Sequence, residues 1–201
     1  MRPPARGLGK AVLAAIGLRL VLIPAFYAAN SVLLGARKAG IRPDYQLITN
    51  VYRIENAVRL LVTMLIALLF MIWVRSEIVS LRSVGIQTKT SPLMAILGWF
   101  IPFANFVFPV LAVREVWKYR LPRSPAVLPV VWWVAYLASM VTNNVPLPFP
   151  LGMLVTLTAF GTWFALVWSV VMASPEASRG SVGPMPFPAP QGYYAPPPPR
   201  M

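Results

Sequence analysis

The residues best suited to binding chemistry form a small polar set within an apolar chain. Asn105 lies between Pro102 and Pro109, where a regular helix cannot continue because each proline removes a backbone donor. Unwound backbone beside an amide side chain can bind an ion or a polar group, as broken helices do in transporters. The same amide could instead satisfy the backbone groups that the prolines free. Asn105 is therefore a candidate ligand site with two interpretations.

Three charged residues complete this set. Arg19 lies inside an apolar stretch, where a charge is costly. It predicts either an internal anion or substrate site, or a side chain that reaches the headgroups and pairs with Glu115 or Glu77. Arg114 and Glu115 are adjacent, so on a helix they point about 100° apart. Glu115 is then either a proton carrier or a neutralising partner for a basic neighbour such as Lys118.

The chain lacks the usual catalytic and metal-binding side chains. It has no histidine and no cysteine, and only five acidic residues. The commonest metal ligands and the usual general base at neutral pH are therefore missing. We expect no enzyme activity, no metal and no cofactor.

The net charge of +13 comes from 18 basic and 5 acidic residues. In a soluble protein such a balance suggests nucleic acid. Here the basic residues flank apolar runs, so they are better explained as orientation signals and contacts for anionic lipid headgroups. We expect a lipid bilayer as the partner and no nucleic acid.

The elements that position these residues are apolar runs of membrane-spanning length. Hydrophobic residues make up 58% of the chain, charged residues 11%, and the mean hydropathy is +0.67, against about 25% charged in a soluble domain. A transmembrane helix needs about 20 mostly apolar residues. Four stretches are candidates, at about 11–34, 57–74, 126–142 and 151–173.

A fifth apolar region, residues 91–120, is broken by its prolines. We expect a short helix from Pro92 to about Ile101, an irregular centre over 102–108 and a second helix from Pro109 to about Tyr119. Each half has about ten residues and so spans about 15 Å, half a bilayer. Such a segment either dips into the membrane and returns or lies along its surface.

Basic residues outside the spans favour a non-crossing fifth segment. If it crosses, the two sides carry six and ten basic residues, and if it does not they carry twelve and four. The second division fits the positive-inside rule better. The expected fold is an all-α polytopic bundle of four transmembrane helices plus a re-entrant or interfacial segment, with both termini in the cytoplasm.

The chain divides into three parts by composition. A basic segment, 1–10, precedes a membrane domain, 11–173, and a proline-rich tail, 174–201. The tail cannot bury enough apolar area to offset its ordering entropy, so we expect it to be disordered. A protein that binds proline-rich ligands is a candidate partner for it.

The motif around the broken segment resembles a bacterial membrane family known as a domain of unknown function, DUF4328. The resemblance rests on a pattern of aromatic, glycine and proline residues that ends in Arg-Glu-x-Trp. These residues are Phe70, Trp73, Arg75, Pro92, Gly98, Trp99, Phe100, Pro102, Asn105, Pro109, Arg114, Glu115 and Trp117. The resemblance implies a bacterial cytoplasmic membrane protein and brings no activity with it.

Two functions agree with these observations. The first is a non-enzymatic scaffold or regulatory membrane component, which fits the missing catalytic residues and the proline-rich tail. The alternative is a small transporter or channel component that uses the broken segment around Asn105, and it requires a homo-oligomer because four spans enclose little volume. The seven tryptophans predict interfacial belts and helix packing.

Overall fold

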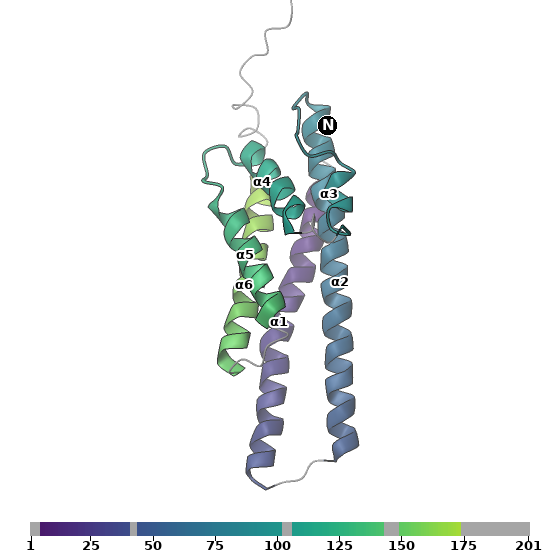
Figure 1. Ribbon diagram of the computed structural model, residues 1–201, viewed down its shortest axis with the longest axis vertical. Helices are drawn as coiled ribbons and strands as arrows, with labels where there is room; N and C mark the ends of the chain where they lie inside the picture. The colour runs from purple at the N-terminus through teal and green to yellow at the C-terminus, as the bar shows by residue number, and fades with distance from the viewer. Residues whose placement is uncertain (1–4, 41–43, 102–105, 143–148, 174–201) are drawn as a thin grey trace, which may run out of the picture.

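The computed structural model is helical throughout the part it describes, residues 5–40, 44–101, 106–142 and 149–173 (Figure 1). This confirms the all-α prediction for those residues, which contain no strand. The helices are α1 (Ala5–Lys38), α2 (Tyr45–Ser83), α3 (Met94–Leu97), α4 (Phe108–Arg120), α5 (Val127–Thr142) and α6 (Phe149–Met172).

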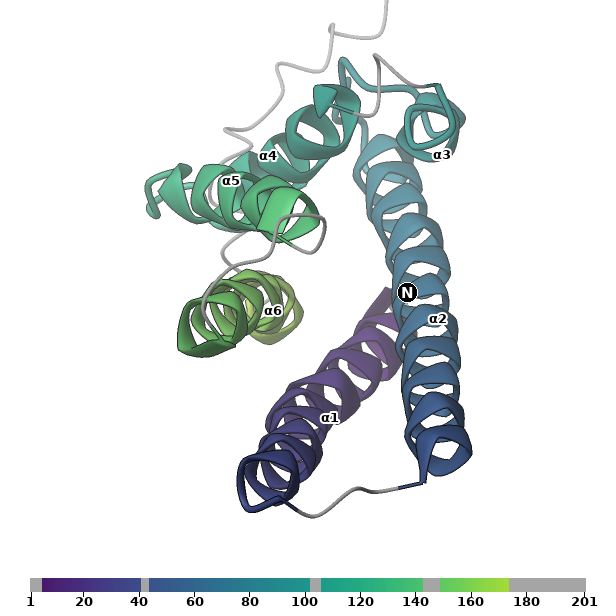
Figure 2. The ribbon, with the colours of Figure 1, turned by 60° about the horizontal axis from the view of Figure 1, so that its bottom comes forward.

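The four longest helices run up and down beside one another. α1 packs against both α2 and α6, and α6 packs against α5. The first turns of α1 lie beside the last thirds of α2 and α6, since a Cβ added at Gly9 would lie 3.1 Å from Trp73 Nε1 and would contact Val171 Cγ2. We call this the α4 end of the bundle, because α4 also lies there (Figure 1). Toward the opposite end α1 and α2 diverge (Figure 2).

Within the described residues, three helices are long and apolar enough to cross a membrane. The qualifying segments are Arg6–Leu33, Tyr45–Ser83 and Pro150–Met172. α5 is apolar but has only 16 residues, so three of the four expected spans meet the length of a crossing. The architecture fits a membrane-embedded helical bundle.

Two of the helices, α1 and α2, are longer than the apolar runs that predicted them. α2 has 39 residues and extends beyond 57–74 at both ends, because polar residues can continue a helix once it is nucleated. Asp44 caps its start by accepting a hydrogen bond from the backbone N–H of Gln46 at 2.9 Å. α1 likewise continues through Pro24.

The first half of the broken segment contains less helix than expected. α3 has four residues, whereas the prediction ran from Pro92 to about Ile101. After Leu97 the backbone tightens into turns, with the N–H of Trp99 bonded to the Ile96 carbonyl and that of Phe100 to the Leu97 carbonyl. The second half, α4, matches its prediction within one residue at each end, with Pro109 in its first turn. Pro102 and Asn105 lie outside the described residues.

Aromatic side chains form the centre of the bundle. The Phe70 ring lies 5.0 to 6.0 Å, centroid to centroid, from the rings of Trp73, Trp99, Trp132 and Trp163. Trp73, Trp132 and Trp163 are fully buried. These three tryptophans therefore serve helix packing rather than an interfacial belt.

Candidate functional site

Arg19 is buried in the middle of α1, and two of its three guanidinium nitrogens have no hydrogen-bond partner among the described residues. Its side chain is only 5% exposed, and its Cζ lies 5.6 Å from the centre of the Phe160 ring on α6. Within the described part of the chain, its Nε and Nη1 donate to nothing. A cation over an aromatic face gains some stabilisation, but a buried guanidinium with unmet donors remains costly. The fold by itself does not satisfy this group.

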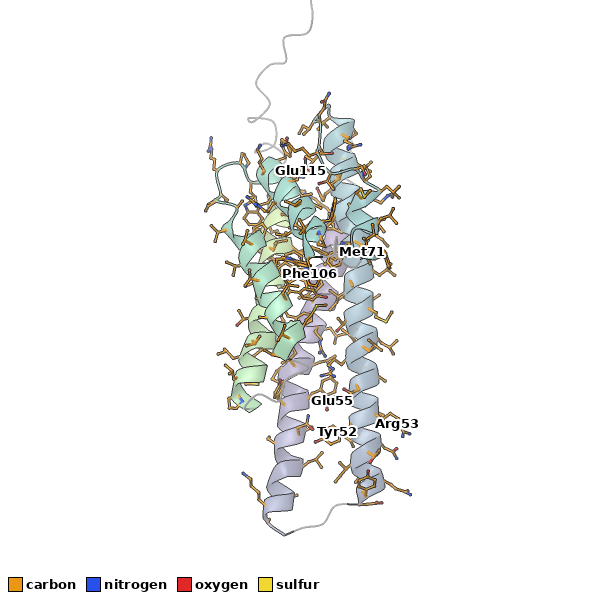
Figure 3. All side chains as sticks on the ribbon, viewed as in Figure 1. Tyr52, Arg53, Glu55, Met71, Phe106 and Glu115 are labelled. Carbon is orange, nitrogen blue, oxygen red and sulfur yellow. The ribbon has the colours of Figure 1, made fainter. Side chains whose placement is uncertain are left out.

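Arg19 lines a cavity of about 360 Å³, a volume at the small end of ligand sites. α1 and α2 each contribute side chains three or four residues apart, which share one face of a helix. In Figure 3, Tyr52 and Glu55 point from α2 toward α1, while Arg53 points away. The lining residues are Arg19, Ile23, Phe26, Tyr27, Asn30, Tyr52, Glu55, Asn56, Arg59 and Thr156.

Two cationic side chains and one anionic side chain line the cavity. Arg19 and Arg59 carry positive charge and Glu55 carries negative charge. Asn30 Nδ2 donates to Glu55 Oε2 at 3.1 Å, and Arg59 Nη2 donates to Asn56 Oδ1 at 2.7 Å. Asn30 Oδ1 is buried and, among the described residues, accepts no hydrogen bond. This arrangement can hold an anion by charge-assisted hydrogen bonds.

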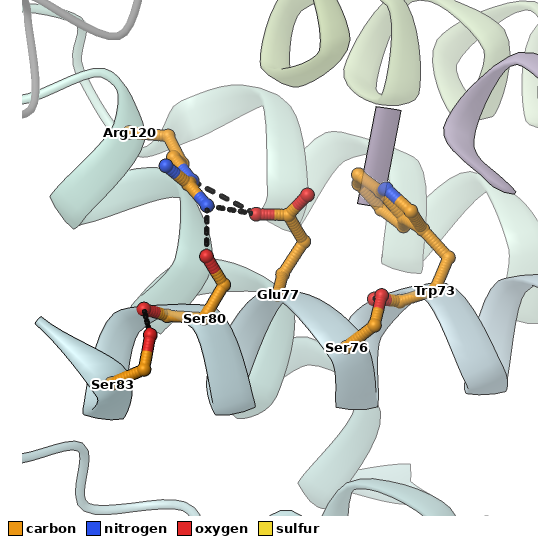
Figure 4. A network of polar contacts seen from close by, with 6 residues as sticks. All are labelled: Trp73, Ser76, Glu77, Ser80, Ser83 and Arg120. Atoms are coloured by element: carbon orange, nitrogen blue, oxygen red, sulfur yellow. Dashed lines mark hydrogen bonds and ion pairs between the residues drawn. The ribbon is translucent and has the colours of Figure 1, made fainter. Parts of the chain in front are cut away.

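A second polar cluster lies at the α4 end and joins α2 to α4 (Figure 4). Arg120 Nε donates to Glu77 Oε2 at 2.8 Å, and Arg120 Nη2 lies 2.6 Å from the same oxygen. Arg120 Nη2 also donates to Ser80 Oγ at 3.2 Å. Glu77 thus pairs with Arg120 and not with Arg19, whereas the snorkelling interpretation of Arg19 offered Glu77 as its partner.

Glu115 binds the loop between α2 and α3. Its two carboxylate oxygens accept the backbone N–H groups of Lys89 and Thr90, the second at 2.9 Å. Arg82 closes the same loop by donating to Thr88 Oγ1 at 2.7 Å and to the carbonyls of Thr88 and Thr90 at 3.2 Å each. Glu115 therefore has a distant partner in the loop rather than the local one considered from sequence. Arg114 beside it is exposed.

The family motif residues that the structure describes mostly pack the broken segment against the bundle. A Cβ added at Gly98 would lie 2.6 Å from Phe108 Cβ, so α3 and α4 approach closely there. The Trp99 ring meets those of Phe70 and Trp133 edge-on, with each centroid distance 6.0 Å. Trp133 Nε1 donates to the Phe106 carbonyl at 2.8 Å.

Three further motif residues, Trp73, Pro109 and Trp117, are buried. Their burial indicates a structural role. The candidate ligand site at Asn105 lies outside the described residues.

The structure brings Arg19 together with residues that sequence reasoning did not select. Asn30, Glu55 and Arg59 fall outside the polar set proposed from sequence. Their signal was spacing, because Glu55 and Arg59 are four residues apart on one helical face. No group of three or more acidic side chains that could hold a metal ion gathers in the described residues.

The comparisons identify a family and no characterised relative. The model of a domain of unknown function, DUF4328, matches residues 47–176. No curated protein and no solved structure matches the chain. The match begins after α1, so Glu55 and Arg59 lie within it and Arg19 lies before it. The prediction from the motif is confirmed, and the chain belongs to the DUF4328 family.

Proposed function

We propose that this protein is a non-enzymatic regulatory membrane component that binds a small anionic ligand in the cavity between α1, α2 and α6. The observation that carries the proposal is the buried Arg19 guanidinium, whose Nε and Nη1 have no partner in the described part of the chain. An anion would offset the desolvation cost through charge-assisted hydrogen bonds. Binding is therefore favoured by the desolvation cost that the protein's own described side chains do not offset.

The lining chemistry supports binding rather than catalysis. Glu55 is the one carboxylate among the lining residues. With no histidine or cysteine in the chain, an acid and base pair or a strong nucleophile would have to come from other side chains. The ligand is then held and released unchanged.

The proposed membrane placement has four crossings with both termini in the cytoplasm of a bacterium. α5 supplies the fourth crossing with its 16 residues, about 24 Å of helix. The broken segment dips into the bilayer, because Trp99 packs at the level of Phe70, about 20 Å along α2 from Ser83. Phe100 and Phe106 near its tip are exposed and would contact lipid. The cavity then lies in the half of the membrane away from the cytoplasm.

The α4 end supplies a proposed contact for anionic lipid headgroups. Exposed basic side chains gather there on α2, the following loop and α4. They are Arg75, Arg82, Lys89, Arg114 and Lys118. A protein partner for the proline-rich tail and a transporter site at Asn105 stay predictions, since both lie outside the described residues.

The test is anion-dependent stabilisation of the purified protein in detergent. At constant ionic strength, sodium butyrate in place of sodium chloride is expected to raise Tm, because a ligand that binds only the folded state stabilises it. Arg19→Gln should abolish the rise. The matched control is Arg53→Gln, since Arg53 points away from the cavity (Figure 3), and it should respond like wild type. An equal rise in Arg19→Gln, or no rise in wild type, would refute the proposal.

A further inference from the structure

The cavity has two ends of opposite polarity. Because α1 and α2 run antiparallel, the Asn30–Glu55 hydrogen bond marks the end nearer their connection. Arg59 lies one turn deeper on α2, toward the middle of the bundle, and Arg19 lies about three turns deeper than Asn30 on α1. The inner end therefore carries the Arg19 guanidinium, the outer end carries a carboxylate and an amide, and Arg59, bonded to Asn56, lies between the two ends.

The two ends require opposite chemistry from a ligand. Guanidinium groups donate hydrogen bonds and do not accept them, so the inner end calls for an anion. At the outer end, Glu55 is an acceptor when ionised, and the buried Asn30 Oδ1 is an acceptor without a donor among the described residues. The outer end therefore calls for an N–H donor, best of all a cationic one.

We infer that the cavity binds a small zwitterion, with its carboxylate at Arg19 and Arg59 and its ammonium group at Glu55 and Asn30. This inference rests on the proposed function and specifies the ligand class. Arg19 and Asn30 are 11 residues apart on α1, or about 16 Å along the helix. A linear amino acid with a few methylene groups between its charges matches that separation better than an α-amino acid does.

The aromatic lining is consistent with such a ligand. Phe26 and Tyr27 line the cavity and come between Arg19 and Asn30 on α1, while Tyr52 lines it beside Glu55. Their rings offer apolar surface to methylene groups and π faces to an ammonium group. A short chain with a charge at each end has the same order of polar, apolar and polar parts.

The experiment compares three probes by calorimetry on the full chain in detergent. The probes are γ-aminobutyrate, butyrate and glycine, which separate the contributions of the ammonium group and of length. Wild type should bind γ-aminobutyrate about tenfold more tightly than butyrate, and more tightly than glycine. Glu55→Gln, which keeps an acceptor for Asn30, should bring the ratio of the γ-aminobutyrate and butyrate affinities close to one while butyrate still binds.

Two controls separate this inference from the proposed function. Asn30→Ala removes the Oδ1 acceptor from the outer end and should lower the ratio, so the inference does not depend on Glu55→Gln folding. Arg53→Gln should leave both affinities unchanged. If butyrate binds wild type as tightly as γ-aminobutyrate, or Glu55→Gln and Asn30→Ala leave the ratio unchanged, the zwitterion is wrong and the anion site stands. If no probe binds, both proposals fail.

Discussion

The two polar regions of this bundle treat their charges in opposite ways. At the α4 end, Arg120 is bonded to Glu77 and Ser80, and Glu115 accepts two backbone N–H groups. In the cavity between α1 and α2, Arg19 is buried with donors that no described residue accepts. Both regions contain buried or half-buried charge inside an apolar fold. Among the described residues, only the first pairs its arginine with a carboxylate.

This difference in pairing distinguishes charged groups that stabilise the fold from Arg19, which we propose binds a ligand. A buried charge costs several kcal/mol unless it is paired and hydrogen-bonded. At the α4 end the pairing is internal, so losing a partner should cost stability. In the cavity the pairing is absent, so removing Arg19 should cost binding and little stability. Each prediction below changes one side of this comparison.

The largest effect is expected at Glu77. Glu77→Ala leaves the half-buried Arg120 guanidinium without its carboxylate, which should lower the free energy of unfolding by about 3 kcal/mol. The measurement is SDS-driven unfolding in mixed micelles. Glu55→Ala is the comparison on the same helix; it removes one hydrogen bond, from Asn30, and should cost about 1 kcal/mol or less. Equal losses in the two variants would erase the distinction between the regions.

A smaller effect is expected at Glu115. Glu115→Ala removes the acceptor of the Lys89 and Thr90 N–H groups, and we expect a loss of about 1–2 kcal/mol because the loop is partly exposed to water. Hydrogen exchange should rise at those two amides and stay unchanged in α6. The control is Arg114→Ala, at an exposed position one residue away. It should change neither the free energy of unfolding nor the exchange of the Lys89 and Thr90 amides. Unchanged exchange at Lys89 and Thr90 would contradict the assigned role.

The fold was predictable where a local pattern carries the information. The apolar runs predicted the four long helices, and Pro109 placed the start of α4 within one residue. The extent of α2 was not predictable from hydropathy, because its first two turns mix polar and apolar residues and precede the continuous apolar run. The burial of Trp73, Trp132 and Trp163 depends on how three helices meet, which no single stretch encodes.

The candidate site was predictable only in part. Arg19 was selected because a charge within an apolar run is unusual wherever it occurs. Glu55 and Asn30 were not selected, because each is an ordinary polar residue near the end of a predicted span. Their significance comes from the register of α1 against α2, which joins residues 25 positions apart. A sequence pattern identifies the costly residue but not the side chains that the fold gathers around it.

The smallest change in stability is expected at Arg19 itself. Arg19→Met replaces a buried, unpaired guanidinium with an apolar side chain of similar length, a change that is often neutral or stabilising by about 1 kcal/mol or more. SDS-driven unfolding should therefore show equal or greater stability than wild type, while the butyrate-dependent rise in Tm disappears.

The contrast with Arg120→Met makes this prediction decisive. Both variants remove one arginine from the bundle interior, but Arg120→Met leaves the buried Glu77 without its partner and should cost about 3 kcal/mol. If Arg19→Met were as destabilising as Arg120→Met, Arg19 would be a structural residue whose pairing the fold already provides. If Arg19→Met is stable but butyrate no longer raises its Tm, Arg19 serves ligand binding rather than the stability of the fold.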